Sequence, residues 1–168
     1  QVRYDAFARL DADRVATAHT LNDNLETVLL NLVRGTGLRG LCGIPPVRGR
    51  IIRPLIHCTR AQVEAYCREQ NLHYVTDSTN LQEDYTRNRL RRQVLPRLLE
   101  INPNLLSGVG GMIQRLRQDE DFLTQAAQQA QGNWLQGEAL LVAPYLQVPK
   151  ALRQRGLLAL LRERNIPI

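Results

Sequence analysis

The chain has 168 residues, of which 43% are apolar, enough for an ordinary globular core and against intrinsic disorder. It has no apolar run of about twenty residues and no signal-like start, so we expect no membrane association and a cytoplasmic location. Lys150 is the single lysine among 22 basic residues, and the net charge of +6 favours a polyanionic partner bound through guanidinium groups.

The cysteines and the chain ends carry less information. Cys42, Cys58 and Cys67 are odd in number and show no C-x-x-C spacing, so we expect reduced thiols and neither a disulfide framework nor a zinc site. The chain starts at Gln1 inside a helix-like pattern and ends at Ile168 with apolar residues that lack an evident partner. We interpret it as a fragment.

A strand that leads directly into a helix is predicted between Val15 and Gly40. The run from Val15 to His19 is typical of a buried strand, and a helical apolar face follows at Leu25, Val28, Leu29, Leu32 and Val33. Ligands of parallel sheets bind at the carboxyl ends of strands. Candidate functional residues therefore lie between the two patterns: His19, Asn22, Asp23, Glu26 and Thr27.

The start of this helix carries two acidic residues. Thr20 and Asp23 have the form of a capping box, which places Asp23 and Glu26 in the first turn and on one face. Together they could hold a cation, either an ammonium or a magnesium ion, or they could only stabilise the helix through its dipole. A G-x-G-x-x-G string begins at Gly35, but it follows a helix, so it indicates a loop and not a dinucleotide site.

The next segment mixes short elements and turns. Residues 50–56 predict a loop or short edge strand near the cleft, with Arg53 in it. Thr59 and Gln62 form a second capping box at the start of a helix that ends near Asn71. A short strand over residues 72–75 and a polar turn over residues 76–80 follow.

From Asp84 the pattern is helical and rich in arginine. Arg87 and Arg91 share a helix face at four-residue spacing, with Asn88 and Arg92 beside them. Such a surface suits phosphate or carboxylate, and a merely solvated helix face is the alternative. We predict three segments: the α/β part over residues 1–81, a helical linker over 82–131 and the start of a small helical domain over 132–168.

Four blocks together resemble the tRNA(Ile)-lysidine synthetase family. They are AHTLNDNLETVLLNLVRGTGLRGL from Ala18, RPL from Arg53, DSTN from Asp77 and YTRNRLR from Tyr85. The family belongs to the N-type ATP pyrophosphatases. The resemblance implies an α/β fold: the C-terminal half of a truncated parallel-sheet, adenine nucleotide α-hydrolase-like nucleotide-binding domain, followed by an all-helical region. The family's S-G-G-x-D-S phosphate loop is absent from the sequence, so we expect the fragment alone to be inactive.

The resemblance implies ATP-dependent ligation of lysine to C2 of the wobble cytidine of tRNA(Ile) with a CAU anticodon. An adenylated tRNA intermediate forms, and AMP and pyrophosphate are released. ATP and Mg²⁺ are the implied cofactors, the tRNA and free L-lysine are the implied partners, and a homodimer is left open. Two alternatives also stay open: a sister enzyme that adenylates a tRNA base and delivers sulfur, and a noncatalytic basic RNA-binding module.

The resemblance also implies roles for individual residues, which we carry over only where the motifs match. The implied catalytic residues are His19, Asp23, Arg87 and Arg91. The implied lysine-binding residues are Asp23, Glu26 and Arg91. The implied residues for ATP or tRNA phosphates are His19, Arg53, Arg87, Asn88 and Arg89, and the implied supporting residues are Thr27, Asp77 and Asn80. Thr20, Asn22 and Asn24 replace the family's usual His, Asp and Gln. The metal ligands are left open, because Asn22 removes one of two adjacent carboxylates.

Overall fold

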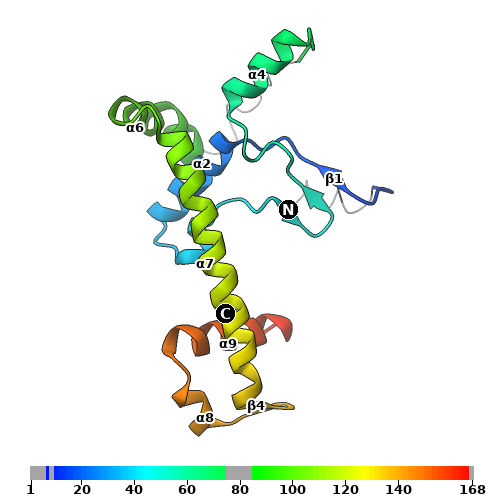
Figure 1. Ribbon diagram of the computed structural model, residues 1–168, viewed down its shortest axis with the longest axis vertical. Coiled ribbons are helices and arrows are strands. Elements are labelled where there is room, and N and C mark those ends of the chain that lie inside the picture. The colour runs from blue at the N-terminus through cyan, green and yellow to red at the C-terminus, as the bar shows by residue number, and fades with distance from the viewer. Residues whose placement is uncertain (1–6, 8–9, 75–84, 167–168) are drawn as a thin grey trace. The chain divides into compact units, whose positions relative to one another are not determined.

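The computed structural model describes residue 7, residues 10–74 and residues 85–166 (Figure 1). The chain divides into two compact units, Gln1–Gln114 and Arg115–Ile168. The sequence predicted three segments instead of two units, and the division into those three domains stays a prediction. No helix in the described part of the chain is long and apolar enough to cross a membrane.

The first unit contains a small mixed sheet. β1 (Val15–Ala16) pairs in parallel with β3 (Ile51–Ile52), and β2 (Val47–Arg48) pairs with the other edge of β3 in the antiparallel sense. The α/β class is therefore confirmed, whereas a purely parallel sheet is not. Within the described ranges two sequence-based expectations are corrected: β3 is the central strand and not an edge strand, and β1 is an edge strand and only half-buried.

α2 (Leu21–Val33) follows β1 and provides the acidic first turn. Its predicted capping box is present, with Thr20 as the N-cap. The expected apolar face is confirmed at Leu25 and Val28, which are buried, but it is wrong in the last turn, where Leu32 and Val33 are exposed. The helix ends as predicted next to Gly35, whose φ of 72° suits a residue without a Cβ.

The rest of the first unit is mostly helical. α3 (Leu38–Leu41) is a single turn inside the G-x-G-x-x-G segment, and α4 (Arg60–Glu69) begins at the predicted capping box of Thr59 and Gln62. Residues 72–74 are not a strand, and Val75 lies outside the described residues. The next helical elements are α5 (Tyr85–Arg89), the π-helix η2 (Leu90–Val94), α6 (Leu95–Ile101) and α7 (Leu105–Trp134).

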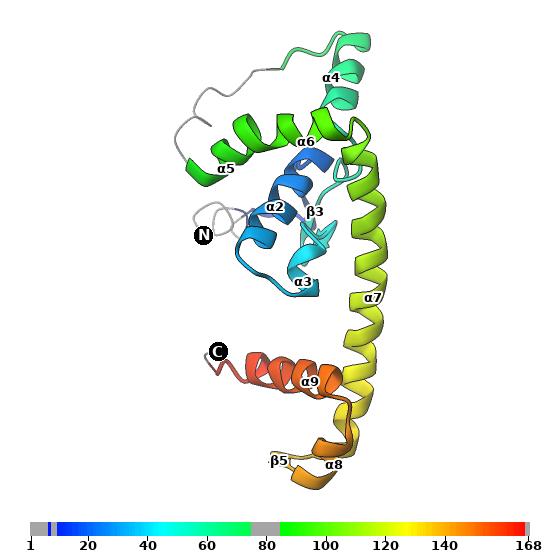
Figure 2. The same cartoon turned by 90° about the vertical axis from the view of Figure 1, so that its left-hand side faces the viewer.

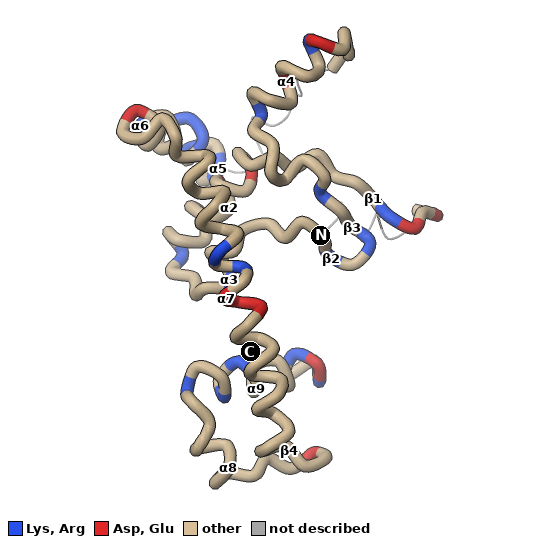
Figure 3. The backbone as a smooth tube through the Cα atoms, viewed as in Figure 1, with Lys and Arg blue, Asp and Glu red and all other residues tan. Residues whose placement is uncertain are grey.

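The arginine-rich segment packs against α2. Both α5 and η2 contact α2, and Figure 2 shows this helical run beside the start of α2. Leu90 and Leu95 are buried, and the backbone N–H of Leu95 donates to the carbonyl of Leu90, which closes the wider π turn. The basic residues of α5 and η2 form a local group in Figure 3. This packing brings the arginines next to the acidic first turn of α2.

The second unit has its own core around Trp134, which is fully buried. The ring of Tyr145 packs edge-on against Trp134 with centroids 5.3 Å apart, and Arg155 Nη1 donates to Glu120 Oε2 at 2.6 Å. An antiparallel hairpin, β4 (Leu135–Gln136) with β5 (Ala139–Leu140), interrupts the helices, so the expected all-helical region is wrong here. α8 (Val142–Gln147) and α9 (Lys150–Glu163) complete the unit.

Candidate active site

The two carboxylates of α2 have different environments. Asp23 Oδ2 accepts hydrogen bonds from the backbone N–H of Thr20 at 2.8 Å and from its hydroxyl at 2.7 Å. Asp23 Oδ1 instead faces arginine side chains, and the Asp23 side chain is 21% exposed. The Glu26 side chain is only 2% exposed. Asp23 therefore offers one accessible oxygen, whereas Glu26 is a buried charge that needs a partner.

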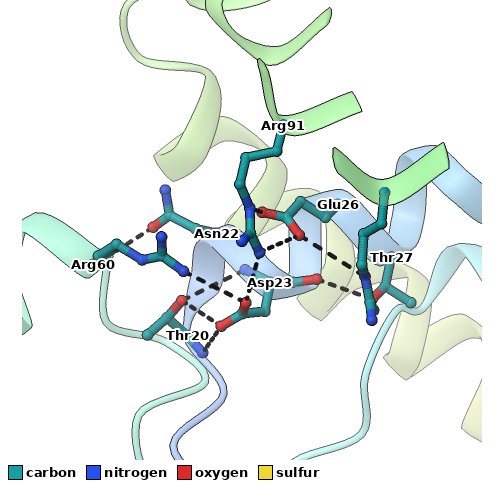
Figure 4. A network of polar contacts seen from close by, with 8 residues as sticks. Thr20, Asn22, Asp23, Glu26, Thr27, Arg60 and Arg91 are labelled. Atoms are coloured by element: carbon teal, nitrogen blue, oxygen red, sulfur yellow. Dashed lines mark hydrogen bonds and ion pairs between the residues drawn. The ribbon is translucent and has the colours of Figure 1, made fainter. Parts of the chain in front are cut away.

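Arg91 is that partner. Its Nε donates to Glu26 Oε1 at 2.7 Å and its Nη2 donates to Glu26 Oε2 at 2.8 Å, a bidentate pair between residues 65 positions apart (Figure 4). Arg91 Nη2 also lies 3.7 Å from Asp23 Oδ1. The hydrogen bonds to Glu26 raise the pKa of Arg91 above its ordinary value, burial opposes this rise, and the charges of Glu26 and Asp23 add to it. Arg91 is therefore a permanent cation.

Arg87 approaches the same turn of α2 from α5. Its Nη2 donates to Thr27 Oγ1 at 3.2 Å, and its Nε lies 3.9 Å from Glu26 Oε2. Thr27 in turn donates its hydroxyl to the carbonyl of Asp23 at 2.9 Å. Among the described residues, Arg87 Nε has no hydrogen-bond acceptor. The structure thus assembles five of the predicted site residues in one cluster: Asp23, Glu26, Thr27, Arg87 and Arg91.

The remaining predicted residues have other surroundings. Arg53 is buried, and its Nη1 donates to the carbonyl of Pro45 at 2.7 Å. His19 Nδ1 lies 2.9 Å from the hydroxyl of Thr17, and Arg89 Nε donates to Gln93 Oε1 at 3.3 Å. Asn88 is half-buried. Asp77 and Asn80 lie outside the described residues.

Two further residues at this site were not singled out from the sequence as a pair. The backbone N–H of Arg60, the first residue of α4, donates to Asn22 Oδ1 at 2.8 Å, and Arg60 Nη2 lies 3.9 Å from Asp23 Oδ1. Figure 4 shows Arg60 and Arg91 both directed toward Asp23. The capping boxes predict where α2 and α4 begin in the sequence, but no local signal indicates that the two helix starts meet in space.

The carboxylates do not fit a magnesium site in this arrangement. Both oxygens of Glu26 accept from Arg91, and Asp23 Oδ2 accepts from Thr20. Across residue 7, residues 10–74 and residues 85–166, no group of three or more His, Cys, Asp or Glu side chains could hold a metal ion. The cation between the two acidic side chains is the guanidinium of Arg91.

The cysteines agree with the expectation of free thiols. Cys42 is buried and its Sγ donates to the carbonyl of Leu38 at 3.3 Å, whereas Cys58 and Cys67 are half-buried. None of the three is in a disulfide.

A sequence model of the PP-loop domain matches residues 1–98 of the 168 residues. The chain belongs to the PP-loop domain family. A PP-loop domain implies ATP use. The match starts at residue 1, which conflicts with the expectation that the fragment lacks the part of the domain with the phosphate loop.

Three curated relatives of this PP-loop chain carry the description tRNA(Ile)-lysidine synthase. The protein of Caldanaerobacter subterraneus subsp. tengcongensis is 46% identical over 127 residues, covering 73% of this chain and 27% of the relative. That of Geobacillus kaustophilus is 37% identical over 171 residues, covering 95% and 37%. That of Treponema denticola is 33% identical over 179 residues, covering 99% and 39%. The chain thus spans 27% to 39% of the length of these relatives.

Proposed function

We propose that this PP-loop chain is part of a tRNA(Ile)-lysidine synthetase. The reaction is ATP-dependent ligation of lysine to C2 of the wobble cytidine in a tRNA(Ile) with a CAU anticodon. The observation that carries the proposal is the cluster of Asp23, Glu26 and Arg91, which joins two sequence blocks 65 positions apart. The similarity to proteins described as tRNA(Ile)-lysidine synthases supports the same reaction.

The proposed reaction has two steps. The cytosine O2 attacks the α-phosphorus of ATP and pyrophosphate leaves, which gives an adenylated tRNA. The unprotonated ε-amine of lysine then attacks C2, AMP leaves with the C2–O2 bond electrons, and the amine loses a proton. Both steps move negative charge onto leaving phosphates, which fixed cations stabilise. We propose Arg87 for this role, because its side chain is half-exposed and lies beside α2.

Lysine recognition would centre on Asp23. Both oxygens of Glu26 are occupied by Arg91, so a substrate ammonium would find its acceptor at Asp23 Oδ1, the carboxylate oxygen without a hydrogen bond from Thr20. Glu26 and Arg91 then act by fixing each other beside Asp23. We therefore propose that Asp23 contacts lysine directly and that Glu26, to which the resemblance gives the same role, does not.

Other assignments stay proposals of the same scheme. His19, in the segment between β1 and α2, would orient a phosphate or act as a base, and Arg53, Asn88 and Arg89 would contact phosphates of ATP or tRNA. Asp77 and Asn80 would support the arginine segment. Mg²⁺, a homodimer and a cytoplasmic location are further expectations from the sequence.

A direct test measures pyrophosphate release by the intact protein with tRNA, ATP and lysine. We expect Asp23→Ala and Arg91→Ala each to lower the lysine-dependent rate at least about a hundredfold, the scale of removing one group that stabilises charge at a reacting centre. The control is Arg68→Ala, because Arg68 is exposed on α4 and lies outside the arginine-rich segment. Rates near that of the wild type for Asp23→Ala would remove this residue from the site.

The alternatives give different outcomes in a second measurement. In a thermal-shift assay, free lysine should raise the melting temperature of the protein, because a ligand that binds only the folded state stabilises that state by mass action. Dependence on a sulfur donor in place of lysine would indicate the tRNA-thiolating enzyme. Binding of tRNA without ATP turnover would indicate the RNA-binding module.

A further inference from the structure

Arg60 is held at the candidate active site by two separate contacts. Its backbone N–H donates to Asn22 Oδ1 at 2.8 Å, and its Nη2 lies 3.9 Å from Asp23 Oδ1. The backbone N–H of Leu21 also donates to the carbonyl of Cys58 at 2.8 Å, so the starts of α2 and α4 are joined directly. Because these bonds fix the backbone at Arg60, the direction in which its side chain leaves α4 is fixed as well.

Among the residues that the structure describes, the cluster holds more positive than negative charge. Arg60, Arg87 and Arg91 lie within ion-pair distance of two described carboxylates, those of Asp23 and Glu26. Arg91 is committed to Glu26 through a bidentate pair, and Arg87 donates to Thr27. Arg60 approaches Asp23 only to 3.9 Å, which is longer than a hydrogen bond, and 47% of its side chain is exposed. Arg60 is thus the guanidinium of this cluster best placed to donate to a ligand.

Asp23 Oδ1 and Arg60 Nη2 form a carboxylate and guanidinium pair 3.9 Å apart. An α-amino acid presents the complementary pair, an ammonium and a carboxylate on one carbon atom. We propose that Arg60 binds the α-carboxylate of the substrate lysine while Asp23 binds its α-ammonium. This inference rests on the proposed function, and it leaves the ε-amine at the far end of the substrate free to attack.

Arg91 is the less suitable partner for the substrate carboxylate. To reach it, Arg91 would have to release Glu26, and the carboxylate of Glu26 would then be buried without its bidentate partner. A phosphate group is also a poorer fit than an amino acid beside Arg60, because the negative charge of Asp23, 3.9 Å away, repels a phosphate. A zwitterion satisfies both charges at once.

Asn22 supports this geometry without adding charge. Its amide oxygen accepts from the backbone N–H of Arg60, a bond that a carboxylate could also accept. The amide, however, leaves Asp23 as the nearest acidic partner of the Arg60 guanidinium within the described contacts. The departure from the family pattern at this position is therefore consistent with a site that reserves one guanidinium for a ligand.

The test compares lysine with lysinamide, which keeps the α-ammonium and lacks the carboxylate. The intact protein should prefer lysine by at least about tenfold in kcat/KM, the scale of one charge-assisted hydrogen bond. Arg60→Ala should raise the KM for lysine about tenfold to a hundredfold and change the KM for lysinamide less than about twofold. Arg60→Lys should recover part of the preference. Arg68→Ala, an exposed arginine on the same helix, is the control and should change neither value.

Three results would overturn the inference. Equal kcat/KM values for lysine and lysinamide with the unmodified protein would overturn it directly. An equal loss with both amines in Arg60→Ala would indicate a purely structural residue, and a rise in the KM for ATP or tRNA with no change for lysine would indicate a phosphate-binding residue. Failure of the proposed function looks different, because the unmodified protein would then show no lysine-dependent release of AMP at all.

Discussion

Glu26 and Arg91 show how one buried charge determines its surroundings. A carboxylate that is 2% exposed is costly to desolvate unless hydrogen bonds compensate, and Arg91 supplies two of them at 2.7 and 2.8 Å. The pair also joins η2 to α2, because the planar guanidinium binds the carboxylate through two parallel hydrogen bonds. The same contact therefore stabilises the first unit and positions Arg91 near Asp23.

Removing Arg91 should expose this dependence. We expect Arg91→Ala to lower the free energy of unfolding by about 3 kcal/mol, because it leaves Glu26 buried without its bidentate partner. Arg92→Ala should change it by less than about 0.5 kcal/mol, because Arg92 is exposed. Urea unfolding of the two variants and the unmodified chain measures both values. Equal destabilisation by the two substitutions would contradict the importance of the pair.

The pH dependence of this contribution follows from the raised pKa of Arg91. Because the pKa of Arg91 is raised above its ordinary value in the folded state, the stabilisation is fully present below that ordinary value and is lost only as the pH rises through the higher folded-state pKa. The difference in unfolding free energy between the unmodified chain and Arg91→Ala should therefore stay constant between about pH 8 and 10. A difference that shrinks across this window would mean that Arg91 titrates there.

At the scale of elements, α2 organises the loop that follows α3. Asn24 is 1% exposed, and its Oδ1 accepts from the backbone N–H of Ile44 at 2.7 Å. Gly43 has a φ of 65°, and its Cα lies against the same amide. The next residue along the loop, Pro45, accepts from Arg53. The buried side-chain amide of Asn24 therefore holds the loop whose Pro45 carbonyl accepts a hydrogen bond from the buried guanidinium of Arg53.

Gly43 tests this arrangement. In Gly43→Ala the new Cβ would lie 2.1 Å from Asn24 Oδ1, and the backbone would keep a left-handed conformation. We expect the free energy of unfolding of Gly43→Ala to fall by at least about 3 kcal/mol. Gly49→Ala is the matched control, since Gly49 has a φ of 58° and a Cβ there would meet nothing within 4 Å. The free energy of unfolding of Gly49→Ala should fall by only about 1 kcal/mol. Similar melting temperatures for the two variants would show that the contact with Asn24 contributes little.

The elements also show what the sequence could predict. Both capping boxes and the stop at Gly35 are confirmed, because side chains within a few positions of each other produce these signals. The central position of β3, the β4–β5 hairpin and the exposed last turn of α2 were missed, because each depends on which distant segment provides the partner. The π turn at η2 has no local signal that we identified.

The same distinction applies to the site. The spacing of Asp23 and Glu26, and that of Arg87 and Arg91, correctly predicts one face for each pair, because helix geometry is local. That the two pairs meet came only from the resemblance to a family, since 65 positions separate Glu26 from Arg91. Arg60 was missed because its contact with Asn22 spans 38 positions and no block of the resemblance includes it.

At the scale of the whole molecule, the net charge of +6 and the arginine bias fit a protein that binds a polyanion such as tRNA. Charge alone does not separate an enzyme from an RNA-binding module, because both would release counterions on binding. The two compact units and the PP-loop match over residues 1–98 place the acidic and arginine residues of the site in the family's domain. Only chemistry on the tRNA distinguishes the functions.

The most direct measurement is transfer of labelled lysine to tRNA by the intact protein with ATP. We predict stable incorporation into tRNA(Ile) with a CAU anticodon. We expect none into the same tRNA with uridine at the wobble position, and at least about a hundredfold less with Asp23→Ala. Incorporation that is independent of the wobble base, or that persists undiminished in Asp23→Ala, would contradict the assignment of this cluster as the lysine site of a lysidine synthetase.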